Sequence, residues 1–96
     1  MTHTFTADGS EALEWRGGEG QVAAQGTFGG GTLSLQFSLD NGSTWTNLED
    51  DPASTIAANG SFAFRSMKTD PESYKLRLNL SGATSPNLKV RVGNHL

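Results

Sequence analysis

Apolar residues occupy every second position of the stretch 33–39, which reads Leu-Ser-Leu-Gln-Phe-Ser-Leu. Successive side chains of a β-strand point to opposite faces, so this period of two predicts a half-buried strand. The next four residues, 40–43, read Asp-Asn-Gly-Ser, and Asn and Gly tolerate the positive φ of a tight turn. We therefore predict a hairpin whose returning strand covers residues 44–48.

The same alternation near the end of the chain predicts a second, closing hairpin. Apolar residues alternate with polar ones over 74–80 and again over 88–92, and residues 81–87 form the intervening loop. One face of this hairpin is apolar and the other is basic. If Leu80 pairs with Leu88, then Arg77 lies opposite Arg91, and facing like charges destabilise a sheet unless acids or a partner offset them.

The remaining segments also indicate strands, and none shows a helical period over ten or more residues. We predict strands at 12–15, 21–28, 54–58 and 61–65, with glycine-rich breaks at 17–20 and 29–31 and loops at 50–54 and 66–73. Seven or eight short strands predict an all-β fold, a small antiparallel β-sandwich of the jelly-roll type. Residues 1–96 form one domain, and residues 1–10 are a candidate N-terminal arm.

Composition narrows the classes of protein that the chain can belong to. The hydrophobic fraction is 34% and the net charge is −3, so the core is lean and nucleic acid is not the expected partner. The absence of cysteine excludes disulfides and thiolate chemistry. We expect no signal peptide and no association with a membrane, because no long apolar run is present.

Charge is divided unevenly between the two halves of the chain. Residues 1–52 hold eight of the ten acids and the single base Arg16, whereas residues 53–96 hold two acids and six bases. Two interpretations stay open. Either the fold intermixes these charges, or it presents a two-signed surface that binds an oppositely patterned neighbour.

Residues for catalysis or metal binding are sparse. The histidines His3 and His95 lie near the two ends of the sequence, where chains often fray, so a serine–histidine–aspartate arrangement is not expected. The acidic run 49–51 lacks the spacing of a calcium loop and is interpreted as solvated. We expect no enzymatic activity, no catalytic residue, no cofactor and no metal.

The stretch 38–45 fits the pattern S-x-D-x-G-x-T-W and resembles the Asp-box hairpin of sialidase-like propellers. It occurs once here, so Asp40, Gly42 and Trp45 are interpreted as a structural hairpin, with the aspartate binding turn amides and the tryptophan packed beneath the turn. Aromatic side chains could also stack on sugars. Burial is expected for Trp45 and Tyr74, whereas the pattern around Trp15 leaves its exposure open.

Two longer stretches resemble small virion proteins of tailed bacteriophages. They are G-T-F-G-G-G-T-L-S-L-Q-F-S at 26–38, with its D-N-G-S-T-W turn, and Y-K-L-R-L-N-L-S-G-A-T-S-P at 74–86. The resemblance covers about residues 15–92. It implies a β-sandwich structural protein of the virion, assembled in the host cytoplasm, with no catalytic residues to carry over.

Within this group the expectation is a capsid decoration (cement) protein that binds and stabilises the head. Its partners would be the major capsid protein or other virion proteins, and it would form a homo-oligomer, a trimer by analogy. The alternatives are a tail or tail-fibre component that contacts the host receptor, with exposed aromatics around Trp15, and a stand-alone carbohydrate-binding module. The expected contact residues are the basic positions and the N-terminal segment: Lys75, Arg77, Lys89, Arg91, Thr2, His3, Thr4 and Phe5.

Overall fold

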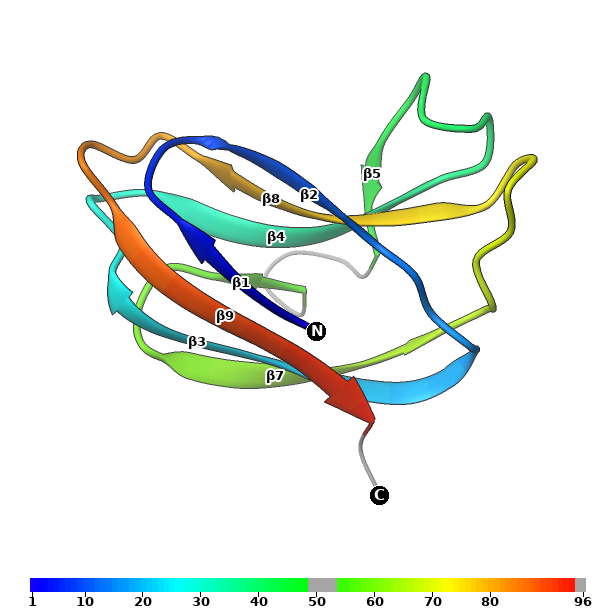
Figure 1. Ribbon diagram of the computed structural model, residues 1–96, viewed down its shortest axis with the longest axis horizontal. Coiled ribbons are helices and arrows are strands. Elements are labelled where there is room, and N and C mark those ends of the chain that lie inside the picture. Colours follow the sequence, from blue (N-terminus) through cyan, green and yellow to red (C-terminus); the bar gives the residue numbers. More distant parts are fainter. Residues whose placement is uncertain (49–53, 95–96) are drawn as a thin grey trace.

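The computed structural model describes residues 1–48 and 54–94, which form two antiparallel β-sheets packed face to face (Figure 1). The described residues contain nine strands and no helix. They therefore include no helix long and apolar enough to span a membrane. The strands are β1 (Thr2–Phe5), β2 (Gly9–Leu13), β3 (Gly18–Thr27), β4 (Thr32–Ser38), β5 (Thr46–Asn47), β6 (Thr55–Ile56), β7 (Gly60–Ser66), β8 (Lys75–Ser81) and β9 (Asn87–Asn94). The prediction of an all-β sandwich is confirmed.

The strand order is that of a jelly roll. Sheet A has the order β1-β9-β3-β7, and sheet B has the order β2-β8-β4-β5, with β6 also paired to β4. Strands from the two halves of the chain pair in nested fashion, β1 with β9, β2 with β8 and β3 with β7. The nested pairs alternate between the two sheets, as in a long hairpin rolled into a double layer.

The predicted closing hairpin is wrong, because β8 and β9 belong to different sheets. Strand β8 pairs with β2 and β4, whereas β9 pairs with β1 and β3. Residues 82–86 carry the chain from one sheet to the other, with positive φ of 73° at Gly82 and 48° at Ser85. Both strands alternate apolar and polar residues because both cover the same core, and this alternation does not specify which strands pair.

The first predicted hairpin is confirmed, although its returning strand is short. Gln36 pairs with Asn47 and Phe37 pairs with Thr46, so β5 has two residues where the pattern predicted five. Strand β4 ends at Ser38, and Leu39 is 64% exposed. Leu39 therefore does not share the buried face that its spacing predicted.

The core lies between the two sheets and consists mainly of aliphatic side chains. Each sheet contributes every second residue of its central strands, and each fully buried leucine adds about 1.5–3 kcal/mol. Phe5 and Trp15 are aromatic members of the same buried cluster. The residues with under 2% exposure are Leu33, Leu35, Leu76, Leu78, Leu80, Leu88, Val22, Val90, Ser38 and Ser54.

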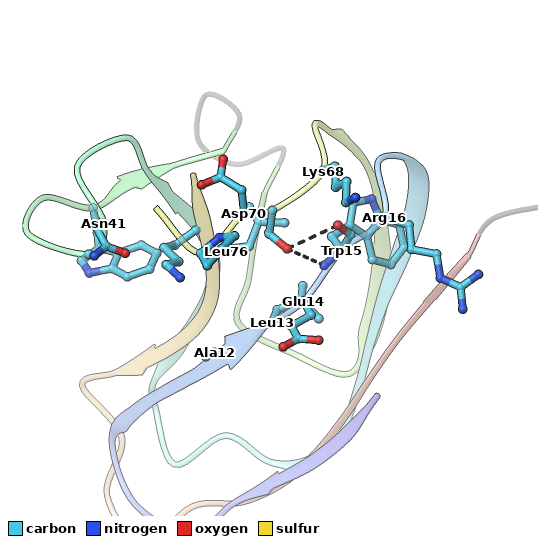
Figure 2. A pocket seen from close by; sticks show the side chains of 14 residues that line it. Ala12, Leu13, Glu14, Trp15, Arg16, Asn41, Lys68, Asp70 and Leu76 are labelled. Carbon is cyan, nitrogen blue, oxygen red and sulfur yellow. Dashed lines mark hydrogen bonds between the residues drawn. The ribbon is translucent and has the colours of Figure 1, made fainter. Parts of the chain in front are cut away.

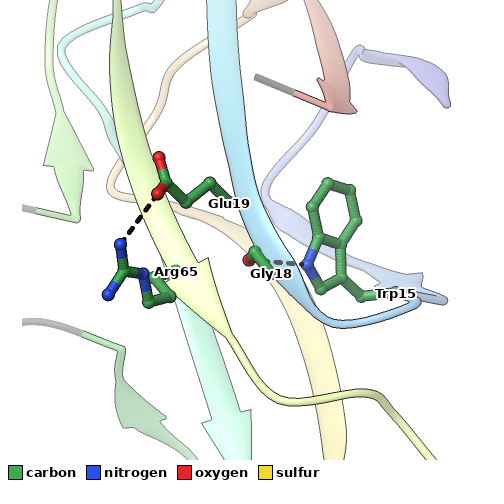
Figure 3. Close-up of polar contacts among 4 residues, drawn as sticks. All are labelled: Trp15, Gly18, Glu19 and Arg65. Carbon is green, nitrogen blue, oxygen red and sulfur yellow. Dashed lines mark hydrogen bonds and ion pairs between the residues drawn. The ribbon is translucent and has the colours of Figure 1, made fainter. Parts of the chain in front are cut away.

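The glycine-rich stretch 17–20 was expected to interrupt the sheet, but β3 begins within it at Gly18. The indole Nε1 of Trp15 donates a hydrogen bond of 3.2 Å to the carbonyl of Gly18 (Figure 3). A Cβ at Gly20 would lie 2.6 Å from Cζ of Phe64 and would also meet the Trp15 ring. Glycine is therefore required where the tryptophan crosses the strand.

The start of the chain is an edge strand of sheet A and not a free arm. Thr2–Phe5 pairs with β9 along its length, as the two strands at the front of Figure 1 show. The amide of Val92 donates a hydrogen bond of 2.9 Å to the carbonyl of Met1. Phe5 is 3% exposed, so this strand contributes to the core.

Candidate binding surfaces

The structure divides the predicted basic face between the two outer faces of the sandwich. Lys75 and Arg77 alternate with buried residues of β8, so they project from the outer face of sheet B. Lys89 and Arg91 alternate with buried residues of β9 and project from the outer face of sheet A. The predicted like-charge contact between Arg77 and Arg91 is therefore absent, because the core lies between them.

Sheet A brings together four of the predicted contact residues. Thr2 is the register partner of Arg91, and Thr4 is the register partner of Lys89. All four are exposed on the outer face of sheet A. His3 and Phe5 have the opposite orientation, with Phe5 in the core and His3 packed edge-on against it at 4.5 Å between ring centroids.

Arg77 is engaged within the fold. Its Nε donates a hydrogen bond of 2.8 Å to Oε1 of Gln36, and Nε2 of Gln36 donates one of 3.1 Å to Oδ1 of Asn47. Its guanidinium carbon lies 4.4 Å from the ring centroid of Trp45. These contacts tie β8, β4 and the β4–β5 turn together across the outer face of sheet B.

The turn before β5 is organised by Asp40, as the Asp-box pattern predicted. Oδ1 of Asp40 accepts hydrogen bonds of 2.6 Å from the hydroxyl of Ser38 and 2.8 Å from the amide of Thr44. These bonds stabilise the carboxylate and lower the pKa of Asp40 from 3.8 to about 2. Asn41 and Gly42 have positive φ of 61° and 98°, which is the turn chemistry expected of these residue types.

A second aspartate organises the loop between β7 and β8. Asp70 accepts hydrogen bonds of 2.7 Å from the amide of Ser73 and 2.8 Å from the amide of Glu72. The bond from Ser73, followed by that from Glu72, lowers the pKa of Asp70. The sequence, with Asp-Pro as a turn signal, predicted a loop at 66–73 but gave no organising role to Asp70.

The aromatic residues lie differently from the prediction. Trp15, whose exposure the sequence left open, is only 8% exposed, which removes the support that the tail alternative drew from it. Tyr74 is buried as expected, and its hydroxyl lies 2.7 Å from that of Ser66. Trp45 is partly exposed, because it precedes β5 and packs under Arg77 on the outside of sheet B.

Sequence reasoning missed a groove at the end of the sandwich where three connections meet. Its volume is about 810 Å³, and it is lined by the end of β2 with residues 14–16, by the β4–β5 turn, by residues 68–71 of the β7–β8 loop and by the start of β8 (Figure 2). Trp45, Lys68 and Lys75 are among its lining residues. The groove could not be found from a linear pattern, because four separate segments each contribute only a few residues.

Residues considered for metal binding and catalysis give no assembled site in the described ranges. Residues 1–48 and 54–94 contain no cluster of three potential metal ligands. The acidic run 49–51 and His95 lie outside the described residues. His3 has its Nδ1 3.7 Å from Oε1 of Glu11, a contact that joins the edge strands of the two sheets.

These features define a class of protein, a small jelly-roll β-sandwich with polar side chains on the outer faces of both sheets and a loop-lined groove at one end. No protein-family model, curated protein or solved structure matches the chain.

Proposed function

We propose that this protein is a non-catalytic structural component of a tailed-phage particle that binds the head as a decoration protein. The observation that supports this proposal is the grouping of Thr2, Thr4, Lys89 and Arg91 on one sheet face. The resemblance of the stretches 26–38 and 74–86 to small virion proteins supports the assignment to a phage particle.

The outer face of sheet A suits contact with a flat, acidic protein surface. In the row of register partners that crosses sheet A, Arg91 is flanked by Thr2 on one side and by Ala23 and then Ser61 on the other, so its long side chain projects from among short ones. Within residues 1–48 and 54–94, Lys89 and Arg91 form no ion pair. Their charge is thus available to carboxylates of a capsid protein, which would steer and orient docking.

The small size of the fold is consistent with function in an assembly. A domain of 96 residues buries a modest share of its surface, and its edge strand β1 leaves backbone groups unpaired on one side. Association of copies around a symmetry axis, as a trimer by analogy, would cover such edges. Many bound copies bridging capsid subunits would stabilise the shell by mass action.

Charge reversal on the outer face of sheet A tests this function. We expect Lys89→Glu combined with Arg91→Glu to reduce occupancy on purified particles strongly. The matched control reverses two charges on the opposite sheet and its adjoining loop, Lys68→Glu with Lys75→Glu, and should keep full occupancy. Equal occupancy for both double variants would exclude this face as the contact. Density for the protein on the tail in images of intact particles would exclude the decoration role.

A further inference from the structure

We propose that the groove beside Trp45 binds a carboxylated pyranose, a sugar ring that carries an acidic group. This groove lies beside sheet B, whereas the proposed capsid contact is the outer face of sheet A. The two proposals can therefore be tested independently. The proposal rests on three features of the groove, namely its rigidity, its aromatic wall and its charge.

The groove is held in shape by hydrogen bonds among its three walls. The amide of Trp15 donates a bond of 3.0 Å to the hydroxyl of Thr69, and this hydroxyl donates one of 3.3 Å to the carbonyl of Trp15 (dashed lines in Figure 2). The amide of Thr69 donates a bond of 3.0 Å to the same carbonyl. The amide of Asn41 donates a bond of 3.0 Å to the carbonyl of Ser73. A preformed site loses little entropy on binding, and about 810 Å³ accommodates a mono- or disaccharide.

Trp45 provides an aromatic wall for a sugar ring. The guanidinium of Arg77 covers part of the indole at 4.4 Å and restrains its orientation. Trp45 lines the groove, whereas Arg77 does not. An electron-rich aromatic surface attracts the weakly positive C–H groups of a pyranose face.

Charge on the rim favours an acidic ligand. Arg16, Lys68 and Lys75 line the groove, and none of them forms an ion pair within the described part of the chain. The carboxylate of Asp70 accepts backbone amides of its own loop, so its acceptors are already engaged. Hydrogen bonds do not remove the charge of Asp70, so the three cations are balanced by two carboxylates, those of Glu14 and Asp70, and the lining keeps one excess positive charge.

Glu14 supplies an acceptor for the hydroxyl groups of a sugar. A carboxylate that lines the groove can accept hydrogen bonds from such hydroxyls. The side chain of Asn41 offers a further donor and acceptor for hydroxyl groups. The mixture of one aromatic wall, cations and hydroxyl-binding groups therefore fits a sugar ring that carries an acidic group, and titration with adenosine monophosphate tests the alternative of a nucleotide.

Titration of the isotope-labelled protein with glucuronate, followed by NMR, tests this inference. We expect shifts of the Trp45 indole signal and of backbone amides at 41–45 and 68–76, with an affinity of about millimolar. Methyl glucoside, which has the same ring without the acid, should bind about tenfold more weakly. Adenosine monophosphate should bind more weakly than glucuronate.

Variants locate the binding to the groove. Lys68→Gln with Lys75→Gln should weaken glucuronate binding about tenfold or more, because two charge-assisted contacts are removed. The control Lys89→Gln with Arg91→Gln removes the same charge from sheet A and should bind like the unmodified protein. Trp45→Ala should abolish binding, and the lysine variants keep the test valid if this substitution disturbs the fold. Absence of shifts in the groove, equal loss in the control, or tighter binding of adenosine monophosphate would each overturn the proposal.

Discussion

The guanidinium of Arg77 lies 4.4 Å from the ring centroid of Trp45 and fixes the β4–β5 turn against β8. The same side chain donates a hydrogen bond of 2.8 Å to Gln36 on the neighbouring strand. Arg77 was predicted as a contact for a partner, and its charge is instead engaged within the fold. Removal of the Arg77 side chain should therefore lower the stability of the fold.

Arg77→Ala should lower the free energy of unfolding by about 1–2 kcal/mol, the sum of a partly exposed cation–π contact and one hydrogen bond. Urea denaturation followed by circular dichroism measures this change. Lys89→Ala, which removes an exposed cation without an ion pair in the described residues, should change stability by less than about 0.5 kcal/mol. Equal effects for the two substitutions would contradict the role of Arg77 in holding the turn.

Gly20→Ala should destabilise the protein by about 1–3 kcal/mol, because the added methyl group collides with Trp15 and Phe64 in the core. Gly93→Ala is a matched control on the neighbouring strand, since a Cβ there meets no atom within 4 Å. Thermal unfolding of the two variants should show a clear decrease in Tm for the first and little change for the second. A neutral Gly20→Ala would mean that Trp15 does not cross the strand as described.

Phe5→Ala should cost about 3–5 kcal/mol, the range for a large aromatic side chain removed from a core. Thr4→Ala removes an exposed neighbour on the same strand and should have a small effect. The comparison separates an integrated edge strand from a free arm, because truncation of a free arm leaves unfolding by urea unchanged.

The pKa of Asp40, lowered from 3.8 to about 2, predicts a pH dependence of stability. A carboxylate with a depressed pKa in the folded state stabilises the fold fully above its ordinary pKa, and this contribution is lost as the pH falls toward 2. Asp40→Asn should therefore lower Tm near neutral pH and flatten its decline between about pH 5 and pH 2. Glu72→Gln controls for the loss of one negative charge outside this turn.

Much of the fold could be predicted from local patterns. Alternation over 33–39 and 74–80 identified strands β4 and β8, and Asp-Asn-Gly identified the turn before β5. These features depend on side-chain period and on φ preferences, which act within a few residues. The acidic turn at Asp40 was predicted for the same reason.

Strand pairing and the placement of the site were decided only by the tertiary structure. The basic positions of β8 and β9 have the same local pattern, yet the loop 82–86 sends the strands to opposite sheets, so Arg77 and Arg91 lie on opposite faces. Trp45 lies on the outside under Arg77 of another strand, whereas Trp15 is buried against Phe64, also distant in sequence, where Gly20 leaves room for the ring. The alternation of apolar and polar residues predicts which side chains share a face of a strand. Only the packing of the two sheets determines what that face contacts.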